Sequence, residues 1–333
     1  MSPRELDEDD VRVRARGGSR RRTRDRPAHS DARTGMVISV DRGRYTCWVD
    51  DGELIAMRGA DVRRTPLVVG DRVAVVGGDG TSDGLGRIVR LEPRASVLRR
   101  SPDDDDPIER PVVANADLLV CVVALADPPP RTGLIDRVLV AAYDGGLTPA
   151  LCLTKSDLVG TDDHVSAAAE LRATYAPLGL SVVHGGRTDD LHEVEELLSG
   201  RTSVLFGHSG VGKSTLVNRL VPDADRETGD VNAVTGRGRH TSSGAVAFRL
   251  GEGDAWVIDT AGIRSFGLGH LSPNRVLAAF SDLAPGAEEC PTHCTHSADA
   301  PECALDQWVA DGHAEPARLA SLRRLLAARD DDA

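Results

Sequence analysis

Lysine is almost absent from this sequence. Of its 40 Lys and Arg residues, 38 are arginine, and the two lysines are Lys155 and Lys213. The ammonium of lysine is a compact, rotatable point charge, whereas the guanidinium of arginine is a planar fork. In a chain that otherwise uses arginine for its cations, these two lysines are the first candidates for functional residues.

Aromatic residues and long apolar runs are also lacking. Aromatic side chains make up 3% of the sequence, so any nucleic-acid binding would depend on backbone contact and arginine rather than on base stacking. No run of 18 or more apolar residues occurs, and no apolar stretch follows the Arg-rich N-terminus. We therefore expect a cytoplasmic protein with no membrane-spanning helix and no export signal.

The net charge of −12 is unevenly distributed. Residues 1–10 carry −4, residues 11–33 carry nine Arg against two Asp, and the rest of the chain carries about −15. Few apolar residues accompany these charges at the N-terminus, so we expect residues 1–34 to be a disordered Arg-rich tail. The alternative is an arm that contacts the phosphates of a nucleic acid.

Residues 35–98 contain short β-like runs divided by turn signals. Five such runs are typical of a small closed barrel of the OB type, a common nucleic-acid platform. The alternative is a β module that only packs on its neighbour. Residues 99–112, with their acidic run, are expected to be a linker. The expected strands are 35–40, 45–50, 54–58, 72–76 and 87–91, with a hairpin turn at Asp51-Gly52.

Strand-like and helical patterns alternate over residues 113–270. This alternation predicts an α/β fold with a doubly wound, mostly parallel sheet that binds ligands at the carboxyl ends of its strands. Apolar runs at 116–124, 148–153, 180–183, 203–206, 244–250 and 255–258 are the expected strands, and 134–143, 164–175 and 190–198 are the expected helices.

A phosphate-binding loop follows the run 203–206. Its sequence GHSGVGKS matches G-x-x-x-x-G-K-[ST] in the required strand–loop–helix context, which disfavours an ordinary glycine-rich turn. The glycines let backbone N–H groups converge on phosphate oxygens, and the helix N-terminus favours an anion. We expect Lys213 to reach the β- and γ-phosphates and Ser214 to bind Mg²⁺. The expected nucleotide-binding residues are Gly207, His208, Ser209, Gly210, Val211, Gly212, Lys213, Ser214 and Thr215.

The other lysine lies in Thr154-Lys155-Ser156-Asp157, directly after an expected strand. These residues resemble the guanine-specificity motif [NT]KxD of GTPases. Asp157 would accept from the N1–H and N2–H₂ groups of guanine, a pairing that adenine does not offer, and the stem of Lys155 would lie beside the ring. Thr154 replaces the more usual asparagine, which removes an amide partner. The alternative is an ordinary polar turn after a strand.

Two later segments predict the γ-phosphate side of the site. Residues 229–243 are rich in glycine and polar residues and have no periodicity, which indicates a mobile functional loop. The run 255–258 ends in Asp259-Thr260-Ala261-Gly262. The carboxylate of Asp259 can hold Mg²⁺ through water, and the N–H of Gly262 can sense a γ-phosphate.

Three of the six cysteines lie within fourteen residues, with a histidine between them. This clustering indicates a metal site rather than a set of disulfides. Three thiolates and one imidazole complete a tetrahedral Zn²⁺ ion and leave no position for a catalytic water, so the site is expected to be structural. His293 is a competing ligand, and buried free cysteines are the alternative to a metal site. The expected ligands are Cys290, Cys294, His296 and Cys303.

The order of these motifs is unusual for a GTPase, since the guanine motif precedes the phosphate loop by about fifty residues. With an OB-like module in front and a Cys/His cluster behind, the chain resembles the circularly permuted small ribosomal subunit biogenesis GTPases, the RsgA (YjeQ) family. The resemblance covers residues 35–325 and rests on GHSGVGKS, GRGRHTSS, DTAGIRSFGL and the cysteine cluster. The departures are Thr154, Ala261 for proline, Ser242-Ser243 for threonines, and residues 183–185 in place of a Ser-Ala turn that backs guanine.

The resemblance implies a Mg²⁺-dependent enzyme that binds GTP and GDP. It also implies that the enzyme binds the small (30S) ribosomal subunit and its 16S rRNA during late maturation and leaves after hydrolysis. Thr241, or Ser242, is the implied second Mg²⁺ ligand, and residues 259–262 are the implied second switch. A GTPase domain over 113–270, a helical zinc-binding domain over 271–333 and a monomeric state are expected.

The position after DTAG is Ile263, where many GTPases have a glutamine that orients the attacking water. Intrinsic hydrolysis is therefore expected to be slow and to depend on a partner. His240 is the candidate replacement for the glutamine; the alternative is a loop histidine that contacts RNA or nothing. Two other functions fit the residues: a GTP-sensing RNA-binding switch with incidental hydrolysis, and an ATP-using P-loop enzyme such as a kinase.

Overall fold

The computed structural model describes residues 29–78, 84–100, 109–159, 161–224, 245–251, 253–260, 268 and 271–330. Most of the Arg-rich tail and the acidic run at 103–106 lie outside these residues, so what the sequence predicts for them stays a prediction. Within the described ranges, no helix has both the length and the apolar character needed to cross a membrane.

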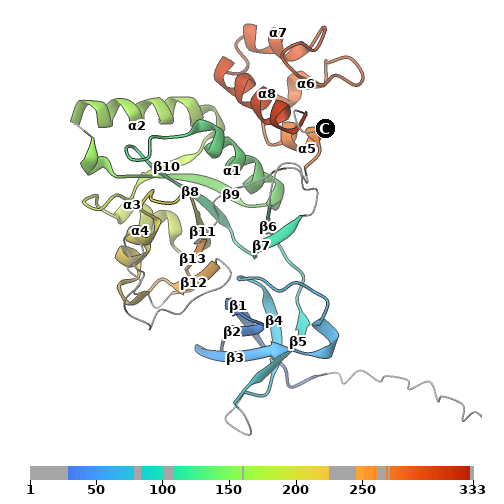
Figure 1. Cartoon of the computed structure of the whole chain (residues 1–333), viewed down its shortest axis with the longest axis vertical. Coiled ribbons are helices and arrows are strands. Elements are labelled where there is room, and N and C mark those ends of the chain that lie inside the picture. The colour runs from blue at the N-terminus through green and yellow to red at the C-terminus, as the bar shows by residue number, and fades with distance from the viewer. Residues whose placement is uncertain are drawn as a thin grey trace, which may run out of the picture. The chain divides into compact units, whose positions relative to one another are not determined.

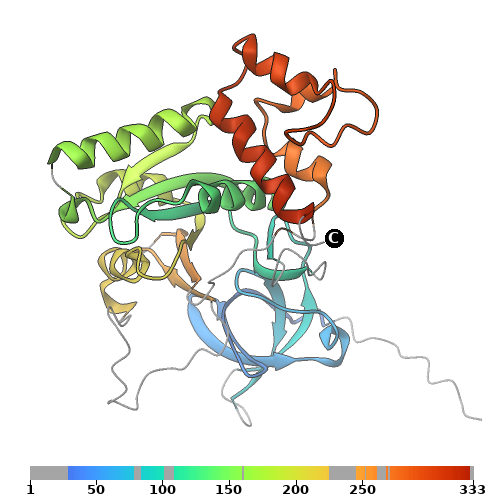
Figure 2. The ribbon, with the colours of Figure 1, turned by 45° about the horizontal axis from the view of Figure 1, so that its top comes forward.

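Five strands close into a barrel at the N-terminal end. Strand β1 pairs with β2 and β4, β2 pairs with β3, and β5 joins β3 to β4, so the ring has no free edge. Figure 2 shows the strands curving round to complete this ring. The five expected strands are confirmed. They are β1 (Arg33–Asp41), β2 (Arg44–Val49), β3 (Gly52–Arg58), β4 (Arg72–Val76) and β5 (Gly86–Leu91).

The hairpin between β2 and β3 turns one residue earlier than predicted. Gly52 already belongs to β3 and pairs with Val49, so the two turn residues are Asp50 and Asp51. Their φ angles are +48° and +60°, the left-handed pair that a type I′ turn requires. The Asp51-Gly52 dipeptide, a common hairpin-turn sequence, predicts the wrong pair of turn residues. Aspartate adopts the left-handed conformation more readily than most residues, so Asp50 and Asp51 can form the turn without glycine.

The predicted linker is in part a β-hairpin. Strand β6 (Val97–Arg100) pairs antiparallel with β7 (Arg110–Ala114). Leu98 and Val113 on these strands are fully buried, and burial of such side chains offsets the entropy cost of ordering the segment. The charged residues between the two strands hide this apolar pairing in the sequence.

The remaining strands form the expected sheet, in the order β10-β9-β8-β11-β13-β12. All neighbours are parallel except β12 and β13, which are antiparallel. Strand β11 therefore lies in the middle of the sheet, between β8 and β13. The strands are β8 (Leu118–Ala124), β9 (Thr148–Thr154), β10 (Ser181–His184), β11 (Thr202–Phe206), β12 (Ala245–Arg249) and β13 (Trp256–Thr260).

Helices cover both faces of this sheet (Figure 1). On β8, Leu119, Cys121 and Val123 belong to the core shared with α1 (Thr132–Gly145) and α2 (Thr161–Tyr175). The alternate residues Leu118, Val120 and Val122 belong to a second core with α3 (His192–Leu198) and α4 (Lys213–Leu220). Because successive side chains of a strand point to opposite faces, the continuous apolar run of β8 fills both layers.

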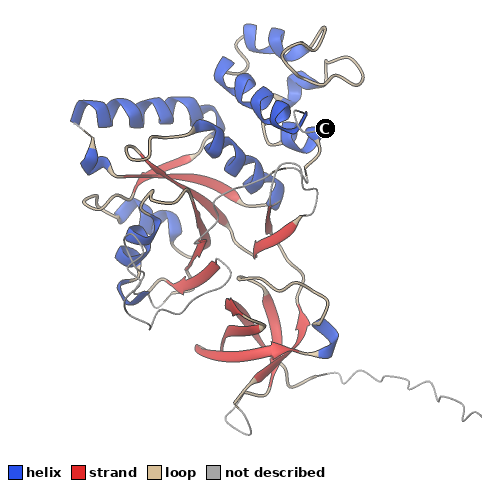
Figure 3. Cartoon of the chain, viewed as in Figure 1, coloured by secondary structure: helices blue, strands red, loops and turns tan. Residues whose placement is uncertain are grey.

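The C-terminal region is helical in its described part, as Figure 3 shows. This agrees with the helical character expected for residues 271–333. The domain limits set out from the sequence are not tested by these elements and stay predictions. The helices are α5 (Pro273–Ala278), α6 (Ala284–Ala287), α7 (Ala304–Ala310) and α8 (Pro316–Asp330).

Candidate functional site

The phosphate loop joins β11 to α4 at the carboxyl end of the parallel sheet. Gly210 and Gly212 have φ angles of +81° and +96°, which residues with a side chain rarely adopt. A Cβ atom on Gly207 would lie 2.4 Å from the carbonyl oxygen of Val122. The glycines of the motif are therefore required by the loop conformation and by the close approach of β8.

Lys213 lies within the curve of this loop. Its Nζ donates to the carbonyl oxygens of Gly207 (2.5 Å) and His208 (3.0 Å). Burial lowers the pKa of the ammonium, and the nearby carboxylate of Asp259 partly offsets that shift. Asp259 is buried on β13, where it pairs in register with Leu205 of β11. The ammonium is thus placed to exchange two carbonyl partners for phosphate oxygens.

The predicted guanine motif follows β9 at the same end of the sheet. Lys155 has a φ of +57°, and its Nζ donates to the carbonyl oxygen of Asp127. A short 3₁₀ turn, Ser156–Leu158, comes next. Asp157 is exposed and has no hydrogen bond or ion pair to any residue that the structure describes. Its carboxylate is available to a ligand.

Thr154 connects the two motifs. Its hydroxyl donates to the carbonyl oxygen of Val211 in the phosphate loop at 2.6 Å, and the residue is 2% exposed. Strand β8 lies between the strands that carry the two motifs, so this bond spans the intervening strand. The asparagine that is more usual at position 154 would offer a side-chain amide. In this chain the hydroxyl of Thr154 takes its place with a hydrogen bond to the phosphate loop.

Replacing Thr154 with valine is expected to loosen the phosphate loop. Valine keeps the shape of threonine but leaves the buried carbonyl of Val211 without its donor, a loss of about 1–3 kcal/mol in the free energy of unfolding. Urea unfolding and GDP titration measure the loss of stability and of affinity. Thr154→Ser keeps the hydroxyl and serves as the control. Equal stability and affinity in both variants would exclude a role for this bond.

Three residues that hold these loops were not predicted from the sequence, namely Asp127, Asp189 and Arg219. Asp127 accepts from Lys155, and Asp189 accepts from the Ser156 hydroxyl at 2.7 Å. Asp127 and Asp189 both follow the carboxyl end of a parallel strand, where this fold class places ligand contacts. That rule could have identified both residues. No sequence signal marks Arg219, which lies half-buried on α4.

Several predicted residues lie outside the described part of the chain. His240, Thr241, Ser242 and Gly262 fall within residues 225–244 and 261–267, so their predicted roles stay predictions. Of the second switch, Asp259 and Thr260 are described. The Thr260 hydroxyl donates to the carbonyl oxygen of Leu205 at 2.7 Å, which holds the end of β13 against β11.

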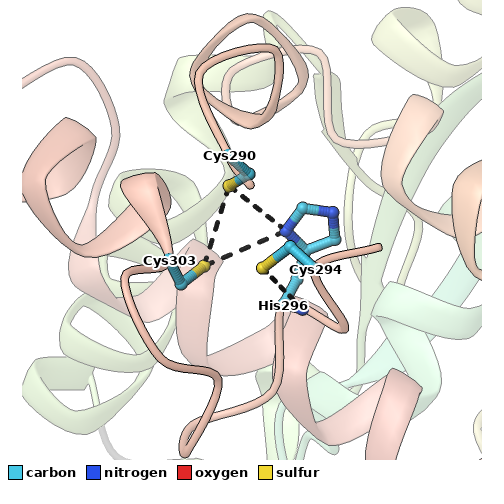
Figure 4. A group of neighbouring side chains, drawn as sticks. All are labelled: Cys290, Cys294, His296 and Cys303. Atoms are coloured by element: carbon cyan, nitrogen blue, oxygen red, sulfur yellow. Dashed lines mark hydrogen bonds between the residues drawn. The ribbon is translucent and has the colours of Figure 1, made fainter. Parts of the chain in front are cut away.

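The Cys/His cluster lies in the loops around α6 and α7 (Figure 4). The four ligand atoms of Cys290, Cys294, His296 and Cys303 all lie within 4.8 Å of one another. The Sγ atom of Cys290 is 4.0 Å from that of Cys303 and 3.6 Å from Nδ1 of His296. A tetrahedral zinc ion with Zn–S bonds of about 2.3 Å would separate its sulfur ligands by about 3.8 Å. The residues present fit such an ion.

The structure places His296 in the cluster and leaves His293 on the surface. Burial, with the charge of Arg323 as a smaller cause, lowers the pKa of His296, which favours the neutral imidazole that a metal binds. Burial also raises the pKa of the Cys303 thiol to about 11. A bound cation would reverse that shift and stabilise the thiolate.

His296→Ala is expected to lose its metal, whereas His293→Ala is expected to keep it. Only His296 lies within coordinating distance of the three sulfur atoms, and three thiolates alone leave a tetrahedral ion one ligand short. Zinc content after purification and the thermal unfolding temperature measure the difference. Equal zinc content in the two variants would show that the cluster does not hold the ion as described.

Comparison with known proteins agrees with this architecture. A family model described as RsgA GTPase matches residues 91–269, more than half of the chain. The small ribosomal subunit biogenesis GTPase RsgA of Pseudomonas syringae pv. syringae (strain B728a) is 40% identical over 269 residues, which cover 80% of this chain and 76% of that protein. Its counterpart in Pseudomonas aeruginosa (strain LESB58) is 41% identical over 265 residues, which cover 78% and 75%.

Solved structures show the same fold. YjeQ from Thermotoga maritima superposes with a TM-score of 0.70 at 24% identity and covers 90% of this chain and 98% of its own. YloQ, described as a circularly permuted GTPase, gives a TM-score of 0.67 at 23% identity and covers 92% and 98%. The expected fold class, a circularly permuted GTPase with an N-terminal barrel, is confirmed, and so is the enzyme class. The chain belongs to the RsgA GTPase family.

Proposed function

We propose that this protein binds GTP between the phosphate loop and the Lys155–Asp157 turn, hydrolyses it with Mg²⁺, and is thereby released from the small ribosomal subunit. The observation that supports the proposal is the hydrogen bond from Thr154 to the carbonyl oxygen of Val211, which links the predicted base-binding motif to the predicted phosphate loop. GDP occupies the same site after hydrolysis.

The chemistry of the phosphate end follows from the residues of the loop. Lys213 neutralises charge on the β- and γ-phosphates, and Ser214 at the start of α4 binds Mg²⁺ together with Thr241 or Ser242. Asp259, next to Lys213, holds the ion through water. A bound Mg²⁺ would offset the negative charge that develops during phosphoryl transfer.

Hydrolysis without a partner is slow, since Ile263 has no group that orients water. His240 supplies that group when the partner is bound, and the Gly262 N–H senses the γ-phosphate. Loss of the γ-phosphate releases both switch segments. The chain runs from the second switch directly into the C-terminal helices, so this release changes how those helices engage the partner.

We propose the small ribosomal subunit as the partner because the relatives are named small ribosomal subunit biogenesis GTPases. The barrel offers a surface that suits 16S rRNA. Arg44, Met57 and Arg87 are exposed and aligned in register across β2, β3 and β5. Neither guanidinium has a partner among the described residues, and free arginines on a mainly acidic chain can bind RNA phosphates.

Zinc is the metal that we propose for the Cys/His cluster, because three thiolates and an imidazole are its common structural ligand set. The ion would tie the loops around α6 and α7 together and would take no part in hydrolysis. A ribosome partner places the protein in the cytoplasm, and we propose that it acts as a monomer.

The test is GTP hydrolysis with and without purified small subunits at a stated salt concentration. We expect a low intrinsic rate that rises at least about tenfold with small subunits and not with large subunits. GTP binding to small subunits without faster hydrolysis would instead identify an RNA-binding switch. Equal competition by ATP and GTP would identify an ATP-using enzyme and overturn the proposal.

A further inference from the structure

A hydrogen-bonded network closes the base-binding side of the site at the loop after β10. Asp189 accepts from the hydroxyl of Ser156 at Oδ1 and from the backbone N–H of Gly186 at Oδ2, both at 2.7 Å. Ser156 is the residue before Asp157 in the guanine motif. One carboxylate therefore joins the guanine motif to residues 185–189.

Arg219 holds the same loop from the helix of the phosphate loop. Its guanidinium donates to the carbonyl oxygen of Gly186 and, at 2.7 Å, to that of Asp189. A planar fork suits two carbonyl oxygens at once, and lysine would not reproduce this geometry. Residues 185–189 are thus fixed from one side by the guanine motif and from the other by α4.

Glycine is required at both positions where this loop begins. A Cβ atom on Gly185 would lie 2.6 Å from Sγ of Cys152. On Gly186 it would lie 2.7 Å from Oδ2 of Asp189 and 3.2 Å from the backbone nitrogen of Lys155. The backbone of the loop therefore packs directly against the start of the guanine motif.

We propose that Asp189 and Arg219 are positioning residues of the guanine pocket. They hold residues 185–189 against the Lys155–Asp157 turn, and this fixes the carboxylate of Asp157 where the base binds. The inference rests on the proposed binding of guanine at Asp157. It predicts a defect confined to base recognition, since neither residue touches the phosphate loop.

The experiment compares Asp189→Ala with Asp190→Asn, and Arg219→Ala with Arg187→Ala. Asp190 is exposed, and among the described residues its side chain accepts only from the backbone N–H of His192, a bond that asparagine also accepts. Arg187 is exposed in the same loop and has no partner in the part of the chain that the structure describes. Dissociation constants for GDP and ADP, and the kcat for GTP, are measured for each variant and the wild type.

We expect both network variants to bind GDP about tenfold more weakly, with ADP affinity and saturated kcat within twofold of wild type. The two control variants keep the wild-type values. Asp189→Asn retains the shape of the side chain and one acceptor, so its GDP affinity is expected to lie between those of wild type and Asp189→Ala. This variant replaces Asp189→Ala in the comparison if the alanine variant does not fold.

Two results would overturn the inference. A GDP affinity that stays at the wild-type value in both network variants would show that the network has no part in base recognition. An equal loss for both nucleotides would show a structural role only. A wild-type protein without preference for GDP over ADP would be a different failure, because it would remove the proposed function on which the inference rests.

Discussion

Lys213→Ala is expected to lower the kcat for GTP hydrolysis by about 10²–10³-fold, the usual cost of removing one preorganised donor from developing charge. The ammonium is held inside the phosphate loop by the carbonyls of Gly207 and His208. It is also close to Asp259. A cation held in this way stabilises charge on the transferring phosphate without reorganising during the reaction. Single-turnover hydrolysis at saturating GTP measures the effect.

The control is the other lysine of the chain. Lys155→Ala is expected to weaken GTP binding and to change the saturated rate little, because Lys155 lies at the base-binding end and donates to Asp127. Circular dichroism checks that both variants are folded. A Lys213→Ala rate within about threefold of wild type would contradict the placement of this ammonium on the reacting phosphate.

Asp157→Asn is expected to exchange the preference for GTP for a preference for xanthosine triphosphate. The carboxylate accepts two hydrogen bonds from guanine, whereas asparagine offers one acceptor and one donor. Xanthine carries a carbonyl oxygen in place of the amino group of guanine, so it matches the asparagine. Loss of a charged acceptor is expected to weaken GTP binding about a hundredfold. Competition titrations with the two nucleotides measure the exchange.

Because Asp157 is exposed and has no partner in the described ranges, the substitution is expected to leave the free energy of unfolding within about 0.5 kcal/mol of wild type. Unfolding in urea is the control. If the variant keeps the wild-type preference for GTP, Asp157 does not contact the base, and the assignment of the Lys155–Asp157 turn as the guanine site is wrong.

Local patterns in the sequence predicted much of the architecture. The residues of the phosphate loop are contiguous, and the cysteines of the cluster are closely spaced. The backbone turn of the loop and the grouping of the thiols therefore depend on residues that are near one another in the sequence. The apolar run of β8 predicted a strand buried on both faces for the same reason. The hairpin at Asp50-Asp51 and the strands of the predicted linker were misjudged, because aspartate in the left-handed region and apolar pairs beside charged residues give weak local signals.

The spacing of residues in the sequence does not decide whether His293 or His296 is the fourth member of the Cys/His cluster. Both histidines lie between two of the cysteines, and the ligand count admits either. Which imidazole faces the sulfur atoms depends on the path of the loop around α6 and α7, and the structure turns His296 inward.

The sequence by itself determined the class of fold, the position of the glycine-rich loop after β11 and the three cysteines of the Cys/His cluster, because each of these depends on residues that are neighbours in the chain. Only the tertiary structure decided that Thr154 bonds to Val211, and that Asp189 and Arg219 join the guanine motif to α4. These partners lie 30 to 57 positions apart. They meet because parallel strands bring their carboxyl ends to one edge of the sheet. Which side chains are then in contact cannot be deduced from their spacing in the sequence.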